Sequence, residues 1–295
     1  MTDSTRLDDG TAPVFVVGTG RCGSTIVDSV LSMHPAFSWI PSWVDTFRVP
    51  ELAVVNRLWA LPGTDEYRLR RYFPTPIEPY ETFSRYDSEF WTEEITEDGI
   101  CSARRHIVPL IRRICRAHGN PRFLGKLVGR PVKVNLFHHL YPDAYFVHVT
   151  RELKPTLSSL LKVDFYTDWG RHLDEWPWEK IPAPLLDFYE RTGRSNLIGA
   201  AIGLYLNRRK VDEQLQAVDR DHVLEIPYAA FVEDPVASAR AIANRVSLGF
   251  SDAFADRIAA RSIYGGADEK WRRHLKADVS DQIDALQELI DAGSG

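Results

Sequence analysis

The sequence predicts an α/β fold of three layers, with helices on both faces of a central parallel sheet. Short apolar runs typical of buried strands occur at residues 14–17, 144–150 and 222–228. Stretches with helical spacing of apolar residues separate them, and such alternation favours a parallel sheet covered on both faces. The first run ends in a glycine-rich turn that leads into a helix, which is the outline of a phosphate-binding loop.

The first strand–turn–helix unit occupies residues 14–35. The apolar run ends at Gly18, and Ser24 or Thr25 is the predicted start of a helix. Apolar residues recur on one face of this helix until His34 and Pro35 end it. The turn between strand and helix is therefore short and rich in glycine.

Later segments repeat the pattern. Residues 133–140 look helical and stop before a Tyr-Pro-Asp turn signal, after which the strand 144–150 places Arg151 at its C-terminal end. A helix then begins near Pro155, in a first turn that tolerates proline. A shorter strand is expected at 123–128. The last strand, 222–228, is flanked by two predicted helices, 201–218 and 235–246.

Two regions fit this alternation poorly. Residues 36–120 contain scattered prolines and tryptophans, and residues 164–196 are dense in aromatic side chains. Neither shows a clear core pattern, so we interpret both as insertions over one face of the sheet. The whole chain, 1–295, is then one domain whose first 12 residues are expected to be flexible. The tryptophans of the insertions either pack a lid or line a binding site.

The composition excludes several classes of protein. The chain has 295 residues, of which 44% are hydrophobic and 26% charged, and its net charge of −5 argues against a dominant nucleic-acid surface. The polar, acidic N-terminus lacks the features of a signal peptide, and no apolar run predicts a transmembrane segment. The cysteines at 22, 101 and 115 have no metal-ligand spacing. We expect a cytoplasmic protein without a metal site.

The glycine-rich turn departs from that of a nucleotide hydrolase. Backbone N–H groups of such a turn and of the following helix start make a cradle for an anion. In the kinase and NTPase pattern a lysine follows the last glycine, but here Ser24 stands in that position and Arg21 lies inside the turn. The residues alone leave two alternatives, an anion site with its cation at Arg21 or a sheet-to-helix turn that binds nothing.

The segment GRCGST resembles the first motif of the sulfotransferases that use 3′-phosphoadenosine 5′-phosphosulfate (PAPS), in particular their bacterial and protein-tyrosine branch. In this chain Cys22 replaces the serine that is usual in the motif. The second motif of the family is an arginine at a strand end with a serine eight residues later, and Arg151 and Ser159 match it, with Glu152 in place of the usual aspartate. Without the resemblance, Arg151 would be a surface ion-pair partner.

Further segments agree with the resemblance. The stretch YPDAYFVHVTR is similar to the strand that leads into the second motif, IPYAAFVEDPVASA to a Tyr-Glu-Asp-Leu segment, and KWRRHL to a basic segment that closes over the nucleotide. The resemblance implies a P-loop-type nucleotide-binding fold. It also implies nucleotide contacts from Thr19, Gly20, Arg21, Cys22, Gly23, Ser24, Thr25, Arg151, Ser159, Tyr228, Lys270, Trp271 and Arg272.

The implied reaction moves a sulfonate group from PAPS to a hydroxyl of a small-molecule or glycan-like acceptor. Arg21 is then placed to stabilise the leaving oxygen. Lys126, with Arg130 as a possible helper, matches a lysine near the sulfonate, although LVGRP replaces the usual sequence after it. The acceptor also needs a base. The candidates are Asp45, since the family's glutamate is missing from this stretch, and His106.

Two other functions remain open at this point. A P-loop kinase or another NTP-dependent transferase would use the same loop, but it gives no role to Arg151 and Ser159 and lacks its lysine. A catalytically degenerate nucleotide-binding protein would explain the missing glutamate and the altered residues after Lys126.

Overall fold

The structure is a computed structural model that describes residues 11–59, 75–92, 94–120, 122–129, 131–163, 180–261, 271–275 and 277–293. Some of the predictions above fall outside these residues. They concern the site residues Lys270 and Arg130 and the tryptophans Trp169, Trp176 and Trp178.

Five parallel strands form the sheet, in the order β2-β3-β1-β4-β5. They are β1 (Val14–Gly18), β2 (Phe37–Ser38), β3 (Arg122–Leu127), β4 (Tyr145–Thr150) and β5 (Val223–Pro227). In the central strand, Val16 is level with Lys126 on one side and with Val147 on the other. Because the strands are parallel, the residues that follow β1, β3 and β4 meet at one edge of the sheet.

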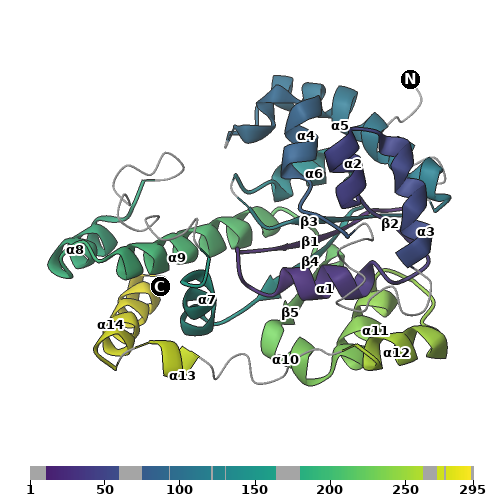
Figure 1. The fold of residues 1–295 in the computed structure, drawn as a ribbon. Helices are drawn as coiled ribbons and strands as arrows, with labels where there is room; N and C mark the ends of the chain where they lie inside the picture. Colours follow the sequence, from purple (N-terminus) through teal and green to yellow (C-terminus); the bar gives the residue numbers. More distant parts are fainter. Residues whose placement is uncertain are drawn as a thin grey trace.

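Helices cover both faces of the sheet, which confirms the predicted three-layer α/β class (Figure 1). Alternate residues of β1 face opposite ways, as a strand requires. Val14 and Val16 pack with α1 (Ser24–Leu31), α10 (Tyr228–Glu233), α11 (Pro235–Arg245) and α12 (Asp252–Ala259). Phe15 and Val17 pack with α5 (Glu97–His118), α6 (Val134–Leu140) and the end of α9 (Asn196–Leu215).

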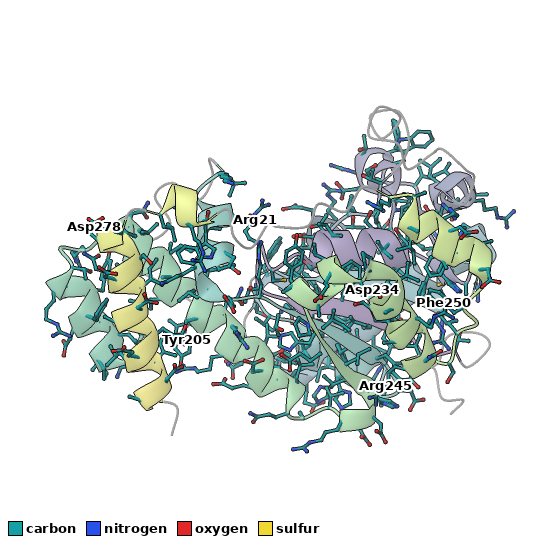
Figure 2. All side chains as sticks on the ribbon, turned by 90° about the horizontal axis from the view of Figure 1, so that it is seen from below. Arg21, Tyr205, Asp234, Arg245, Phe250 and Asp278 are labelled. Atoms are coloured by element: carbon teal, nitrogen blue, oxygen red, sulfur yellow. The ribbon has the colours of Figure 1, made fainter. Side chains whose placement is uncertain are left out.

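A third core lies beyond the carboxyl edge of the sheet. It joins α7 (Leu153–Leu160), α8 (Ala183–Arg191), the first half of α9, α13 (Trp271–His274) and α14 (Ala277–Gly293). In Figure 2 these helices form a lobe beside the sheet, with Arg21 at the junction. The long helix α9 connects the two parts, because Ile198 to Leu206 pack in the lobe while Val211 and Leu215 pack against the sheet.

The region 36–120 differs from its interpretation as an insertion without a core pattern. It supplies the edge strand β2, then α2 (Ser42–Phe47), the 3-10 helix η1 (Pro50–Val55), α3 (Asn56–Trp59), α4 (Tyr80–Tyr86), the 3-10 helix η2 (Ser88–Trp91) and α5. Ile107, Ile111 and Ile114 of α5 are fully buried against the sheet. Paired arginines and Pro109 interrupt the apolar pattern of α5, which hides this helix in the sequence.

Within the described ranges, the structure contains no helix with both the length and the apolar character needed to span a bilayer.

Candidate active site

The turn after β1 has a backbone that fits its glycines. Gly18 has a φ of 150° and Gly23 a φ of 100°, which favours glycine. A Cβ atom on Gly23 would lie 2.0 Å from Cδ2 of Tyr228, so the Tyr228 ring requires glycine at this position. Arg21 also has a positive φ of 68°, a conformation that costs a non-glycine residue about 1–3 kcal/mol. Such strain is typical of functional turns.

The first backbone N–H groups of α1 have no acceptor within the helix. The helical hydrogen bonds begin with the Ile26 N–H, which donates to the Gly23 carbonyl at 3.0 Å, so the N–H groups of Ser24 and Thr25 precede them. The cap residue, Gly23, has no side chain to occupy these donors. The positive end of the helix dipole adds to the attraction for an anion.

The two predicted basic positions lie together. The Nε of Arg21 donates to the Oγ of Ser159 at 3.2 Å, and Nη1 of Arg151 donates to the Arg21 carbonyl at 3.2 Å. The Arg151 guanidinium also stacks 4.5 Å above the Tyr228 ring. Residues from the ends of β1, β4 and β5 and from α7 therefore surround one small volume at the carboxyl edge of the sheet.

Lys126 joins the other side of the loop. Its side chain is only 5% exposed, and Nζ donates to the Oγ1 of Thr25 at 3.1 Å. The same Nζ forms an ion pair with Oε1 of Glu78 at 3.1 Å. Glu78 precedes α4 and its side chain is 47% exposed, so a carboxylate open to solvent stands next to the glycine-rich loop.

A second carboxyl group lies near Lys126. Asp28 of α1 is buried, and burial raises its pKa from 3.8 to about 7. The neighbouring Lys126 ammonium lowers this pKa and the Glu78 carboxylate raises it, both by less than burial. Close to neutral pH, Asp28 therefore exchanges a proton beside the lysine of the site.

The family model for the sulfotransferase family matches residues 13–252, which include every residue of this arrangement. The chain belongs to the sulfotransferase family. The resemblance seen in the sequence is therefore confirmed. The match begins just before β1 and ends at the start of α12.

Solved structures with the same fold agree with this assignment. The sulfotransferase STF9 from Mycobacterium avium is 14% identical with a TM-score of 0.54, and covers 96% of this chain and 76% of its own. The sulfotransferase STF1 from Mycobacterium tuberculosis is 16% identical with a TM-score of 0.54, and covers 92% of this chain and 76% of its own. At such low identity the similarity concerns the fold alone. Among the curated proteins none matches this chain.

In this sulfotransferase the cysteine of the loop is a packed, neutral side chain. Cys22 is 1% exposed, and burial raises the pKa of its thiol above 9.0. The Cys22 N–H donates to the Thr19 carbonyl at 3.3 Å, which closes a turn around Gly20 and Arg21. Ser24 is buried and Thr25 exposed, so the loop offers one inner and one outer hydroxyl. The nucleotide contacts predicted for these residues stay predictions.

The two bases predicted from the sequence have other partners. The Oδ1 of Asp45 accepts from Nη1 of Arg85 at 2.7 Å and from the Oγ1 of Thr82 at 2.8 Å, which ties α2 to α4. His106 lies on the exposed side of α5, with Nδ1 at 3.4 Å from the Oγ of Ser102. Glu78, which contacts Lys126, was missed because no motif marks it and no fixed spacing relates it to the loop.

The C-terminal segment reaches the site through α7. The ammonium group of Lys154 lies 4.9 Å from the Trp271 ring, donates to the Oγ of Ser280 at 2.9 Å and pairs with Oδ1 of Asp284 at 2.6 Å. Arg272 lies with its guanidinium 5.4 Å from the same ring. Trp271 thus packs against the helix that carries Ser159.

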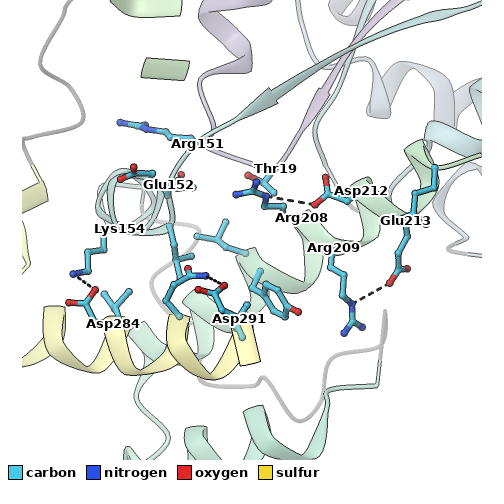
Figure 3. Close-up of a pocket in the computed structure, with 18 residues that line it drawn as sticks. Thr19, Arg151, Glu152, Lys154, Arg208, Arg209, Asp212, Glu213, Asp284 and Asp291 are labelled. Carbon is cyan, nitrogen blue, oxygen red and sulfur yellow. Dashed lines mark hydrogen bonds and ion pairs between the residues drawn. The ribbon is translucent and has the colours of Figure 1, made fainter. Parts of the chain in front are cut away.

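A cavity of about 840 Å³ adjoins the site between α7, α9 and α14 (Figure 3). Thr19 and Arg151 line its end next to the loop. Two ion pairs of α9, Arg208 with Asp212 at 3.7 Å and Arg209 with Glu213 at 3.3 Å, follow its wall. In the described part of the chain, no cluster of three or more His, Cys, Asp or Glu side chains offers a metal site.

Proposed function

We propose that this sulfotransferase transfers the sulfonate group of PAPS to a hydroxyl of a small-molecule or glycan-like acceptor and releases adenosine 3′,5′-bisphosphate (PAP). One observation carries the proposal. The Arg21 side chain reaches Ser159, and the Arg151 side chain reaches the Arg21 carbonyl, each at 3.2 Å. Two cations and a hydroxyl so close together suit a nucleotide with anionic groups at both its 3′ and 5′ positions.

The loop and the second basic position would hold different ends of the nucleotide. The N–H groups at the start of α1, with the hydroxyls of Ser24 and Thr25, suit a 5′-phosphate. Arg151 and Ser159, which follow β4, suit the 3′-phosphate, because a guanidinium and a hydroxyl can share one phosphate group. The Tyr228 ring stacks on the Arg151 guanidinium and helps to fix its position.

The transfer itself needs positive charge at the leaving oxygen. An acceptor oxygen forms a bond to sulfur while the bond from sulfur to the bridging oxygen breaks, and its electron pair stays on the phosphate. Arg21 and Lys126 lie on opposite sides of the loop and supply fixed positive charge there. Burial keeps Lys126 in place, since its side chain is only 5% exposed.

Glu78 joins Asp45 and His106 as a candidate for the base that removes the acceptor proton. It is the carboxylate that contacts Lys126, and its 47% exposure leaves it accessible to an acceptor from solvent. A base must lie within hydrogen-bond reach of the reacting hydroxyl, and proximity to the loop favours Glu78. Asp45 is already engaged by Arg85 and Thr82.

The proposed function is tested in two steps. PAP without Mg²⁺ should raise the melting temperature of the full chain, because a ligand that binds the native state stabilises it. Labelled sulfonate should then pass from PAPS to members of an acceptor panel of alcohols and sugars. Stabilisation by Mg-ATP alone would favour a kinase, and PAP binding without transfer to any acceptor would favour a nucleotide-binding protein without catalysis.

A further inference from the structure

Basic residues are concentrated in one part of this acidic chain. Between Asp98 and Asp143 the sequence contains nine lysines and arginines and no acidic residue, although the net charge of the protein is −5. Lys126 and Lys133 of this segment are buried. Helix α5, in contrast, exposes Arg104, Arg105, Arg113 and Arg116. From Arg104 onward, the exposed surface of α5 is therefore strongly basic.

Exposed apolar side chains gather beside this helix. Five large hydrophobic residues are exposed in the described part of the chain, and three of them fall between residues 47 and 54. Phe47 is 62% exposed, and Val49 and Val54 are each 43% exposed. A single exposed apolar residue is ordinary, but a group within one short segment marks an interaction site.

Contacts between η1 and α5 bring the two features together. Nη2 of Arg113 pairs with Oε1 of Glu51 at 2.7 Å, and the Nε of Arg57 donates to the His118 carbonyl at 2.7 Å. Three residues per turn place Glu51 and Val54 on one side of the 3-10 helix η1, and Arg57 follows in α3. Val54 therefore lies along the last turns of α5. Figure 1 shows α2, α3 and α5 at the same end of the molecule.

We propose that this surface, made of Phe47, Val49, Val54, Arg105 and Arg116, docks on an anionic lipid bilayer. We call it the α2–α5 surface. Apolar side chains that enter the headgroup region, with arginines that attract anionic lipids, are the two components of peripheral membrane binding. A soluble polyanion would use the arginines alone. The combination of both components selects the bilayer, and the inference does not depend on the proposed function.

Vesicle binding tests the proposal with the full chain and without nucleotide. The protein should sediment with vesicles of phosphatidylcholine and phosphatidylserine but not with phosphatidylcholine alone, and added salt should weaken the binding. The double variant Arg105→Ala/Arg116→Ala should weaken it by about fivefold per arginine. Phe47→Ser/Val54→Ser should weaken it as well, because less apolar area enters the bilayer.

Matched controls separate the surface from general effects. Leu161→Ser removes an apolar residue of comparable exposure, 46%, directly after α7, and Arg220→Ala removes an exposed arginine from the segment before β5. Both should bind vesicles as the parent protein does, and unchanged melting temperatures should show that all variants fold. No sedimentation with anionic vesicles overturns the proposal. Loss of binding in the arginine variant alone also overturns it, since a soluble polyanion site would behave in that way.

Discussion

Arg151 is the residue on which recognition of the nucleotide depends most directly. It donates to the Arg21 carbonyl and stacks on Tyr228, so its position is fixed before any ligand arrives. Arg151→Ala should raise the Kd for PAP by roughly 10- to 100-fold, the usual loss for a charge-assisted hydrogen bond. Isothermal titration checks this value. Arg208→Ala is the control, because Arg208 lines the same cavity but pairs with Asp212.

Glu78 is expected to affect turnover without affecting the nucleotide. Glu78→Gln keeps the shape of the side chain but cannot take a proton, so kcat should fall by about 10²- to 10⁴-fold while the Kd for PAP stays the same. Asp45→Asn is the matched variant and should retain most activity, although it weakens the link to Arg85. If Asp45→Asn loses most of its kcat while Glu78→Gln stays active, the base is Asp45 and not Glu78.

Asp28 makes the stability of the protein depend on pH. Its pKa in the folded state is about 7, above the ordinary 3.8, so the folded state binds more protons than the unfolded state between these values. The Asp28 contribution therefore lowers the free energy of unfolding as pH rises from about 4 to 7. Asp28→Asn removes this loss.

Denaturant unfolding of Asp28→Asn at two pH values measures the effect. At pH 8 the free energy of unfolding of the variant should exceed that of the parent protein by about 1–4 kcal/mol, since one pKa unit corresponds to about 1.4 kcal/mol. Near pH 4 this difference should disappear. Asp278→Asn, on the exposed side of α14, should show no such trend. An equal difference at both pH values would mean that Asp28 does not titrate between them.

At the scale of elements, α7 connects the site to the C-terminal helix. Lys154, on the same helix as Ser159, holds Asp284, Ser280 and the Trp271 ring. Lys154→Met keeps the aliphatic stem but loses the ion pair, which is worth about 1 kcal/mol at a partly exposed position. Amides of α14 should then exchange about five times faster with solvent, as measured by hydrogen exchange. Lys162→Met, at an exposed position just after α7, should leave the exchange of the α14 amides unchanged.

The elements that sequence alone predicted are those whose signals are local. The strands β1, β3, β4 and β5 are short apolar runs bounded by turns, and their positions are confirmed within one or two residues. Helix α9 begins at Asn196 rather than near Ala201, because small residues such as Gly199 obscure its first turns. The two-residue strand β2 has too few residues for a pattern, and only pairing with β3 makes it a strand.

In the candidate site, too, only the local signals could be predicted from the sequence. The loop from Gly18 to Thr25 and the pair Arg151 and Ser159 could be found, because each is a motif within a few residues. The link between Lys126 and Glu78 could not be found, since it joins β3 to a segment far away in the chain. No periodicity or spacing records such a contact, which arises only when β3 and the segment before α4 meet at the carboxyl edge of the sheet.

On the scale of the whole molecule, the site lies where separate hydrophobic cores meet. The loop and α1 belong to the core on one face of the sheet, while α7 belongs to the core of the helical lobe. Arg21 bridges them through Ser159, and Figure 2 shows this residue at the junction. A nucleotide held by both the loop and α7 would therefore strengthen the attachment of the lobe to the sheet.

Hydrogen exchange in the presence of PAP tests this coupling. At about 100 times its Kd, PAP should stabilise the native state by about 2.7 kcal/mol. Amides that exchange through local opening in the loop, α1 and α7 should slow most. Amides of α12 should change little, because this helix packs in the same core as α1 but contributes no residue to the site. If PAP protects the amides of α1 but not those of α7, Ser159 does not contact the nucleotide. The 3′-phosphate would then bind elsewhere.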